Sequence, residues 1–225
     1  MLVRVNDFYA FLSVSQEDRL RGKQVAADAA HRAGDMAHVK DYEALAAIAF
    51  HIKPRRVFEI GTYLGVTSDF FLALLPDCHV VSIAYRNSAW NVLRRRFNNS
   101  ELPMQRIGSE VHAERRTRFT QLYGDSHGLK SQSLVATHGY FDLVFVDGDH
   151  SSQGVCQDTI LAEQILSERG AICWHDANPK PRYLAVRQFL EAELPLSAIA
   201  TNDDYLGGIA CWSKEIAERL APVNK

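Results

Sequence analysis

The sequence predicts a single α/β domain in which a mostly parallel sheet carries helices on both faces. Three observations lead to this prediction. From residue 56 onward, short apolar segments alternate with segments of helical period. The central apolar segments have few polar positions, which is typical of strands buried on both faces. The first of them runs directly into a turn with two glycines and then a helix.

Length, charge and cysteine content narrow the class of protein. The 225 residues, 47% of them hydrophobic, suit one domain over residues 1–225. A formal net charge of -2 gives no electrostatic reason to expect a nucleic-acid or membrane partner. No signal peptide or membrane-spanning run is expected, and the four cysteines form no CxxC pair. We therefore expect a reduced, cytoplasmic protein.

Residues 1–53 are expected to form a helical extension ahead of a core at residues 54–225. Ser15 is suited to cap a helix that continues to about residue 33. Leu45, Ile48 and Ala49 recur at helical spacing in a second helix, which Pro54 ends. The apolar character of these helices also suggests a surface for a homodimer.

The core contains seven segments with strand character. They are residues 57–60, 79–84, 118–123, 141–146, 171–174, 196–201 and 208–212. Helices are expected at residues 66–75, 87–97, 129–137, 155–168 and 183–193, with a short helix at the end of the chain. Ligands of parallel sheets bind at the carboxyl ends of the strands, so the polar clusters that follow the strands are the candidate site.

Two basic clusters stand apart from these motifs. One is Arg94, Arg95 and Arg96, and the other is formed by Arg115, Arg116 and Arg118. We interpret both as solvated helix faces or loops. The alternative is a rim that attracts an anionic substrate.

The turn after the first core strand is the leading candidate for a cofactor loop. Gly61 and Gly65 flank it, and Glu59 lies at the end of the strand. The turn lacks both the G-x-G-x-x-G pattern of dinucleotide sites and the Lys-Ser/Thr pair of phosphate loops. An acidic residue at its base favours a cofactor with a positively charged amino group. A plain strand-to-helix turn remains the alternative.

Four motifs occur in order along the core. They are E-x-G-x-x-x-G from Glu59, G-D-S at residues 124–126, D-G-D-H at residues 147–150 and H-D at residues 175–176. Over about residues 40–212 the chain resembles class I S-adenosylmethionine (SAM) dependent methyltransferases. It is most similar to small metal-dependent O-methyltransferases of the catechol type, and among them to a bacterial group with D-G-D-H and H-D. The resemblance implies a Rossmann-like methyltransferase fold with a mostly parallel, seven-stranded sheet.

The resemblance also implies a set of SAM-binding positions. These are Glu59, Gly61, Tyr63, Gly65, Thr67, Tyr85, Asp125, Ser126 and Asp147. Glu59 and Gly61 would hold the methionine end, and Asp125 and Ser126 would border the adenine. One position departs from the family, because Ala84 stands where an acidic residue normally holds the ribose. Tyr85, Arg86 and Asn87 are the neighbours able to compensate.

A divalent metal, Mg²⁺ or Mn²⁺, is expected at the carboxyl ends of the fourth and fifth core strands. Its candidate ligands are Asp147, Asp149, His175 and Asp176, because neighbouring strand ends lie about 5 Å apart. The resemblance assigns Asp147 and Asp176 to the cation, with Ala177 in place of the usual asparagine. It assigns His150 as the general base, a role that suits an imidazole.

Less specific roles are open for several of these residues. Asp149 is equally suited to capping the next helix, and His175 to a structural role. We expect Asp158 to be a solvated or capping acid, with a position that could also reach the site. We expect the remaining histidines to be surface residues: His31, His38, His51, His79, His112, His127 and His138.

The leading functional hypothesis is SAM-dependent methyl transfer to a hydroxyl of a small molecule or sugar, assisted by a divalent metal. The alternative is a catalytically degenerate methyltransferase fold that acts as a ligand-binding or interaction protein, a possibility raised by Ala84 and Ala177. An enzyme of the same fold with another cofactor is the weakest hypothesis.

Overall fold

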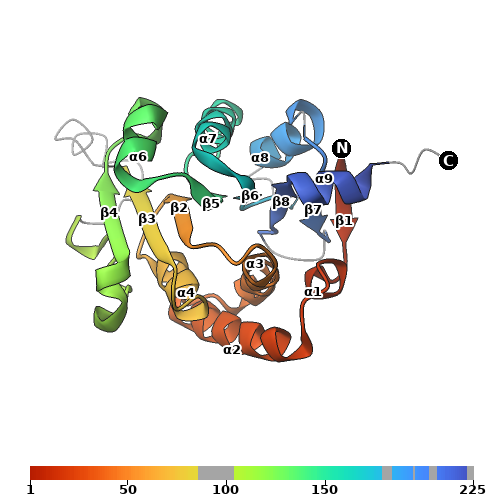
Figure 1. Cartoon of the computed structure of the whole chain (residues 1–225), viewed down its shortest axis with the longest axis horizontal. Coiled ribbons are helices and arrows are strands. Elements are labelled where there is room, and N and C mark those ends of the chain that lie inside the picture. Colours follow the sequence, from red (N-terminus) through yellow and green to blue (C-terminus); the bar gives the residue numbers. More distant parts are fainter. Residues whose placement is uncertain (86–103, 179–183, 195, 203–206, 222–225) are drawn as a thin grey trace.

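One mixed sheet of eight strands forms the centre of the protein in a computed structural model (Figure 1). The structure describes residues 1–85, 104–178, 184–194, 196–202 and 207–221. The strand order is β1-β7-β8-β6-β5-β2-β3-β4. The strands are β1 (Leu2–Val5), β2 (Arg56–Ile60), β3 (His79–Ala84), β4 (Phe119–Tyr123), β5 (Phe141–Val146), β6 (Leu166–Trp174), β7 (Ala198–Thr201) and β8 (Ala210–Ser213).

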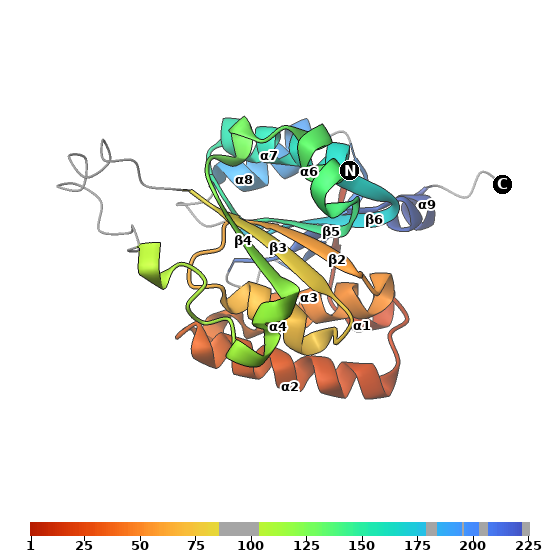
Figure 2. The same cartoon turned by 60° about the vertical axis from the view of Figure 1, so that its left-hand side comes forward.

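Helices cover both faces of this sheet (Figure 2). The α-helices are α1 (Phe8–Phe11), α2 (Gln16–Arg32), α3 (Val39–Ile52), α4 (Val66–Leu74), α6 (Ser131–His138), α7 (Ser152–Ile165), α8 (Leu184–Gln188) and α9 (Lys214–Leu220). Short 3-10 turns are η1 (Met36–His38), η2 (Met104–Arg106), η3 (Ala113–Arg118) and η4 (Ser126–Gly128), and a π-helical turn, η6 (Phe189–Glu193), follows α8. Helices α6, α7 and α8 lie on one side of the sheet, and α3 and α4 lie on the other with α2 outside them.

The sheet is parallel except at β8, which runs antiparallel to both β6 and β7. This confirms the expected Rossmann-like α/β architecture with a mostly parallel sheet. The expected number of seven strands is wrong by one, because β1 pairs in parallel with β7, with Leu2 opposite Ala198. We expected only helices in residues 1–53. The four residues of β1 are a short edge strand, and the partner that makes them a strand lies almost 200 residues away.

The end of α7 also differs from the prediction. A helix over residues 155–168 was expected, but α7 starts at Ser152 and ends at Ile165. The chain passes directly into β6, where Leu166 pairs with Phe141 and the register then shifts before Leu143 pairs with Ala171. Gly170 lies inside this irregular strand and does not end the helix. The tertiary pairing with β5 thus overrides the helical pattern of residues 166–168.

The N-terminal helices are part of the core of the domain. Ser15 caps α2 as expected, since its side chain accepts from the backbone N–H of Asp18 at 3.1 Å. In α3, Leu45 and Ile48 are fully buried and belong to the same cluster as Phe71 of α4 and Phe145 of β5. The apolar face of α3 therefore covers the sheet directly.

The basic cluster near η3 has a structural role that neither sequence interpretation included. Arg115 lies 2.8 Å from the buried carboxylate of Asp69, which also binds Arg32 of α2 at 2.6 Å. Arg116 donates to the carbonyl oxygen of Gly108, and Arg118 donates to three carbonyl oxygens at the end of α4 and beyond. These arginines hold segments together. The other cluster, residues 94–96, and the helix expected at residues 87–97 lie outside the described residues.

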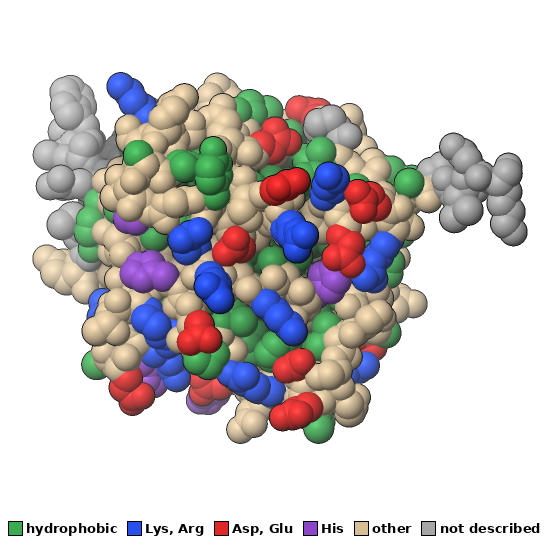
Figure 3. Space-filling view, viewed as in Figure 1, with side chains coloured by type: hydrophobic (Ala, Val, Ile, Leu, Met, Phe, Trp, Pro, Cys, Tyr) green, Lys and Arg blue, Asp and Glu red, His purple; other side chains and the backbone are tan. Residues whose placement is uncertain are grey.

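Surface charges are mixed on the face shown in Figure 3, where acidic and basic side chains alternate over the helices. Among the helices of the described ranges, none combines the length and the apolar character that crossing a membrane requires.

Candidate active site

The glycine turn after β2 brings two loops into direct contact. Gly61 has a φ of +104°, a conformation that glycine adopts readily. A Cβ added at Gly61 would overlap the carbonyl oxygen of Asp147 in the loop after β5. The N–H of Asp147 in turn donates to the carbonyl oxygen of Ile60 at 2.9 Å. The glycine is therefore required for the approach of the Asp147 loop.

Gly65 makes room for a different segment. It is the N-cap residue of α4 with a φ of +85°, and an added Cβ would lie 2.8 Å from the Cα of Gly108. The N–H of Gly108 donates to the carbonyl oxygen of Tyr63 at 3.0 Å. Tyr63 itself has a φ of +46° and is 64% exposed, so its ring lies on the surface beside the turn.

Glu59 lies beneath the turn in a polar network. Its carboxyl group accepts hydrogen bonds from the hydroxyls of Ser68 in α4 and Ser82 in β3. The Ser82 hydroxyl also contacts Thr62 at 2.7 Å, and Gln121 donates to Thr62 at 2.8 Å. Burial raises the pKa of Glu59 to about 8, although the two serine hydroxyls oppose this shift. Glu59 thus connects the cofactor turn to β3 and α4.

A cavity of about 390 Å³ opens at the carboxyl ends of β2, β3, β4 and β5. This lies within the range of roughly 300–1,000 Å³ that is typical of small-ligand sites. Its lining consists of Ile60, Gly61, Ile83, Tyr85, Gly124, Asp125, Ser126, His127, Asp147, Gly148 and Asp149.

The cavity contains only part of the predicted cofactor set. Among the predicted positions, Gly61, Tyr85, Asp125, Ser126 and Asp147 line it. The lining does not include Glu59, Tyr63, Gly65 or Thr67. Thr67 instead lies 3.3 Å from the hydroxyl of Tyr42. Of the neighbours considered as substitutes for the missing ribose acid at Ala84, Tyr85 reaches the cavity, and residues 86 and 87 lie outside the described ranges.

Asp158 contradicts its expected role as a solvated acid. It is fully buried in α7, and its Oδ1 accepts from the hydroxyl of Ser126 at 2.7 Å and lies 3.4 Å from His127 Nε2. Burial raises its pKa. Its Oδ2 is buried without a hydrogen-bond partner in the described part of the chain, close to Gly148. His127, expected on the surface, therefore belongs to the cavity wall.

A cluster of two carboxylates and two imidazoles lies beside this cavity. His175 Nδ1 lies 3.3 Å from Asp147 Oδ1 and 3.3 Å from Asp176 Oδ2. His150 Nε2 lies 2.8 Å from Asp176 Oδ2 and 3.6 Å from Asp147 Oδ1. The loops after β5 and β6 thus bring together Asp147, His150, His175 and Asp176, as their positions after neighbouring strands predict.

The charges in this cluster shift the pKa values of its members. Burial alone would lower the pKa of His150, but hydrogen bonds and attraction to Asp147 and Asp176 raise it to about 9. Burial alone would lower the pKa of His175, but attraction to Asp147 and the hydrogen bonds that the ring donates to the carboxylates of Asp147, Asp176 and Asp41 raise it. Burial alone would raise the pKa values of Asp147 and Asp176. Hydrogen bonds and attraction to His150 and His175 outweigh burial, so both pKa values lie below the usual range. Carboxylates and imidazolium rings stabilise each other here.

The donors in this cluster fit a divalent cation. Asp147, His175 and Asp176 each present one ligand atom within 4.8 Å of the others. Asp176 has a φ of +57°, and its second oxygen, Oδ1, is buried without a hydrogen-bond partner among the described residues. A buried carboxylate oxygen without a hydrogen-bond partner calls for an explanation, and a bound cation would supply the missing partner. Oxygen donors with an imidazole suit Mn²⁺, and the carboxylates alone suit Mg²⁺.

Asp149 does not join this group of ligand atoms. Its carboxylate accepts from the backbone N–H of Ser151 at 2.9 Å and lies 3.0 Å from its hydroxyl. Ser151, not Asp149, caps α7 by accepting from the N–H of Gly154. Asp149 thus orients the capping Ser151 and also lines the cavity.

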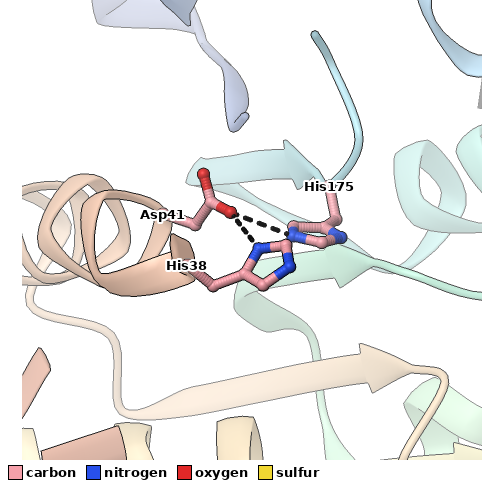
Figure 4. A group of neighbouring side chains, drawn as sticks. All are labelled: His38, Asp41 and His175. Carbon is pink, nitrogen blue, oxygen red and sulfur yellow. Dashed lines mark hydrogen bonds and ion pairs between the residues drawn. The ribbon is translucent and has the colours of Figure 1, made fainter. Parts of the chain in front are cut away.

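The structure adds two residues that the sequence did not single out. His38 and Asp41, at the start of α3, reach the ring of His175, as Figure 4 shows. Asp41 Oδ2 lies 2.6 Å from His38 Nδ1 and 3.4 Å from His175 Nε2. The only local signal was a histidine three residues before an aspartate, which is common on helices. His38 was expected to be a surface residue, but its ring forms part of this group.

The sheet order and the site at the carboxyl ends of its parallel strands define a Rossmann-like α/β protein. Residues 58–177, more than half of the chain, match the family described as a methyltransferase domain, and the chain belongs to that family. This confirms, at the level of family and fold, the resemblance drawn from the four motifs.

Individual relatives are more distant. The chain is 26% identical over 176 residues to the uncharacterized protein y4gI of Sinorhizobium fredii, which covers 77% of this chain. The chain spans about a fifth of the length of that relative (19%). The O-methyltransferase of Bacillus cereus, solved in complex with SAH, has a TM-score of 0.50 at 19% identity, over 89% of this chain and 92% of that one. The O-methyltransferase TomG of Streptomyces achromogenes, in complex with SAM, has a TM-score of 0.47 at 19% identity, over 90% of this chain and 92% of that one.

Proposed function

We propose that the chain binds SAM in the cavity beside Gly61 and Asp125 and transfers its methyl group to a hydroxyl of a small molecule or sugar. The observation that carries the proposal is the position of the cavity. It opens at the carboxyl ends of the parallel strands, and Asp147 belongs both to its lining and to the carboxylate–histidine cluster. A cofactor there would lie next to groups able to handle a proton.

The residues of the chain divide this task between them. When bound, SAM supplies a reactive methyl group on a positively charged sulfur. Tyr85, Asp125 and Ser126 would form the wall against its nucleoside. Asp147 and Asp176 would hold a divalent cation that lowers the pKa of the acceptor hydroxyl. His150, whose Nε2 lies 2.8 Å from Asp176 Oδ2, would take the hydroxyl proton as the oxygen attacks the methyl carbon and the carbon–sulfur bond breaks.

The state of His150 links these roles. The two carboxylates favour its imidazolium form at neutral pH, because they raise its pKa to about 9. A cation that shares these carboxylates would weaken this effect and favour the neutral ring that a base requires. We therefore expect methyl transfer to depend on added Mg²⁺ or Mn²⁺.

Calorimetric titration of the full-length protein with SAM and SAH, each with and without Mg²⁺ or Mn²⁺, tests the proposal. We expect micromolar binding of SAM. Asp125→Asn at the cavity wall should weaken it by roughly tenfold, since hydrogen bonds with charged groups contribute about 1.5–3 kcal/mol. Asp28→Asn, on the exposed face of α2, serves as the matched control. No binding of SAM or SAH under any of these conditions would contradict the proposal and leave the degenerate binding protein as the alternative.

Several finer points remain predictions within this proposal. They are the small-molecule or sugar acceptor, the homodimer, the cytoplasmic location and the single domain over residues 1–225. A panel of phenols, catechols and sugars, assayed for SAH release, would identify the class of acceptor.

A further inference from the structure

A second group of metal-binding side chains joins the N-terminal extension to the end of β6. We propose that His38, Asp41 and His175 bind a divalent transition-metal ion through His38 Nδ1, Asp41 Oδ2 and His175 Nε2. This site is distinct from the carboxylate pair of Asp147 and Asp176, and it does not depend on SAM binding. It makes the N-terminal extension a ligand-bearing part of the active-site region.

The three ligand atoms converge on one point. They lie within 4.8 Å of one another, and Figure 4 shows Asp41 Oδ2 between the two rings. A tetrahedral ion with bonds of about 2.1 Å holds its ligand atoms about 3.4 Å apart. The distance of 3.4 Å from Asp41 Oδ2 to His175 Nε2 meets this value. The 2.6 Å between Asp41 Oδ2 and His38 Nδ1 would open by about 0.8 Å, a small rotation of a ring that is 25% exposed.

The other nitrogen of His175 is oriented as in known metal sites. Its Nδ1 lies 3.3 Å from Asp147 Oδ1 and 3.3 Å from Asp176 Oδ2. A histidine that binds a metal through one nitrogen commonly donates the N–H of the other to a carboxylate, which fixes the ring and raises its basicity. In this arrangement Nε2 is the metal ligand, and Asp147 and Asp176 orient the ring.

The other two ligands have outer partners as well. His38 Nε2 lies 3.5 Å from Asp35 Oδ2, so this ring also has a carboxylate on its far side. Asp41 Oδ1 accepts from the backbone N–H of Gly208 at 2.9 Å, which leaves Oδ2 facing the rings. All three side chains are therefore held by their outer atoms while their inner atoms converge.

The backbone of Gly207 packs closely against the proposed ligand atoms. A Cβ added there would lie 2.5 Å from Asp41 Oδ2 and 3.0 Å from both His175 Nε2 and His38 Cε1. Any side chain at this position would therefore collide with two of the three proposed ligand atoms. Asp41 is only 3% exposed, so an ion here would be largely shielded from water.

The donor set selects the kind of ion. Two imidazoles and one carboxylate suit Zn²⁺, Co²⁺, Mn²⁺ or Fe²⁺, whereas Mg²⁺ and Ca²⁺ prefer oxygen ligands. Three protein ligands leave a position for water or another ligand. The two sites should therefore differ in preference, with Zn²⁺ at His38, Asp41 and His175 and Mg²⁺ at the carboxylate pair.

Titration of the metal-free, full-length protein with Zn²⁺ by calorimetry tests the site, and Co²⁺ absorption reports the ligand geometry. We expect one tight Zn²⁺ per chain. His38→Ala and Asp41→Asn should each weaken Zn²⁺ binding more than about a hundredfold, which exceeds the effect of losing an outer partner. Asp147→Asn removes only such a partner, so it should weaken binding by about tenfold to a hundredfold and keep the stoichiometry.

His51→Ala provides the matched control. His51 also lies on α3 and pairs with one carboxylate, Glu215, at 3.2 Å, but it belongs to neither group of ligand atoms. This variant should bind Zn²⁺ as the unaltered protein does. Wild-type Zn²⁺ affinity in His38→Ala would overturn the proposal, as would the absence of any Zn²⁺ binding. If Asp41→Asn fails to fold, His38→Ala alone decides, because its ring is partly exposed and its removal leaves the contact between Asp41 and Gly208 intact.

Discussion

At the scale of single residues, buried carboxyl groups distinguish this protein. Glu59, Asp158 and Asp176 are almost completely buried, and each contacts hydroxyl or imidazole groups supplied by neighbouring elements. Burial disfavours the charged form of a carboxylate, whereas a nearby imidazolium favours it. The pKa values accordingly move in opposite directions: burial raises that of Glu59, and histidines lower that of Asp176.

Glu59 should make the stability of the protein depend on pH. Its folded pKa of about 8 lies above the ordinary value of 4.5, so the unfolded chain loses this proton first as the pH rises. The free energy of unfolding should therefore fall between pH 4.5 and pH 8, by up to about 5 kcal/mol for this group. In Glu59→Gln this part of the pH dependence should disappear. Urea unfolding at pH 5, 6, 7 and 8 measures it.

Glu17→Gln, an exposed position at the start of α2, is the control and should keep the slope of the unaltered protein. An unchanged slope in Glu59→Gln would show that Glu59 is ionised in the folded state across this range.

His150→Ala should separate catalysis from cofactor binding. Loss of a general base lowers the rate by roughly a hundredfold to ten thousandfold. The SAM affinity should stay unchanged, because His150 does not belong to the cavity lining. SAH release with an acceptor from the panel, together with SAM calorimetry, measures both quantities. His31→Ala, at an exposed position of α2, is the control. Full activity in His150→Ala would remove this residue as the base.

At the scale of elements, the loops after β2, β5 and β6 form one packed unit. Asp147 donates from its N–H to Ile60, and His175 donates from its N–H to Val146, so each loop continues the pairing of the strands before it. The close approach at Gly61 locks the first two loops together. The positions of Asp147 and Asp176 thus depend on how the backbones of these loops pack together, as well as on contacts between side chains.

Gly61→Ala should disrupt this unit. The added methyl group would overlap the carbonyl oxygen of Asp147, and the φ of +104° would be strained as well. We expect a loss of at least about 2 kcal/mol in the free energy of unfolding, and weaker SAM binding. Gly34→Ala has a similar φ of +73° but no atom within 4 Å of its added Cβ, so it should lose only about 1 kcal/mol. Equal losses in the two variants would show that the contact with Asp147 is unimportant.

At the scale of the whole molecule, the N-terminal helices belong to the domain. Leu45 and Ile48 of α3 complete the core on one face, while Asp41 reaches His175 at the carboxyl end of β6. Arg4 of β1 donates to Asn178 and to the carbonyl oxygen of Thr201, which ties the first strand to the loop after β6. Residues 1–53 and the core therefore share both packing and polar contacts.

A chain of residues 54–225 should consequently fail to fold cooperatively. Without α3, one face of β5 and β6 would be exposed to water. Each Å² of apolar surface exposed in this way costs roughly 25 cal/mol of folding free energy. Near-UV circular dichroism measures whether the 54–225 chain keeps its tertiary packing, and thermal unfolding measures whether it unfolds cooperatively. A chain lacking only residues 1–5 should fold with reduced stability, since it loses one edge strand. A native-like unfolding transition in the 54–225 chain would show that the extension is a separate unit.

The sequence was informative where chemistry is local and weak where it depends on distant contacts. The strands from β2 onward and the turn at Gly61 follow from apolar runs and glycines that can be read directly. Asp147, His150, His175 and Asp176 were found because they come directly after neighbouring parallel strands. Strand β1 was missed because its partner, β7, is almost 200 residues away. The same applies to Asp41, which is 134 residues from His175. Asp158 lies at helical spacing from Val155, Ala162 and Ile165, so its inward orientation follows from the period of α7.

The contact between Gly61 and Asp147 has a thermodynamic consequence. One loop borders the cofactor cavity and the other carries a carboxylate of the cation cluster, so ordering either loop changes the free energy of ordering the other. Such coupling is reciprocal: the factor by which SAM raises the affinity for a cation equals the factor by which that cation raises the affinity for SAM. Titrating SAM before the cation, or the cation before SAM, should give the same total binding free energy. Gly61→Ala should reduce the coupling factor between SAM and the cation toward one.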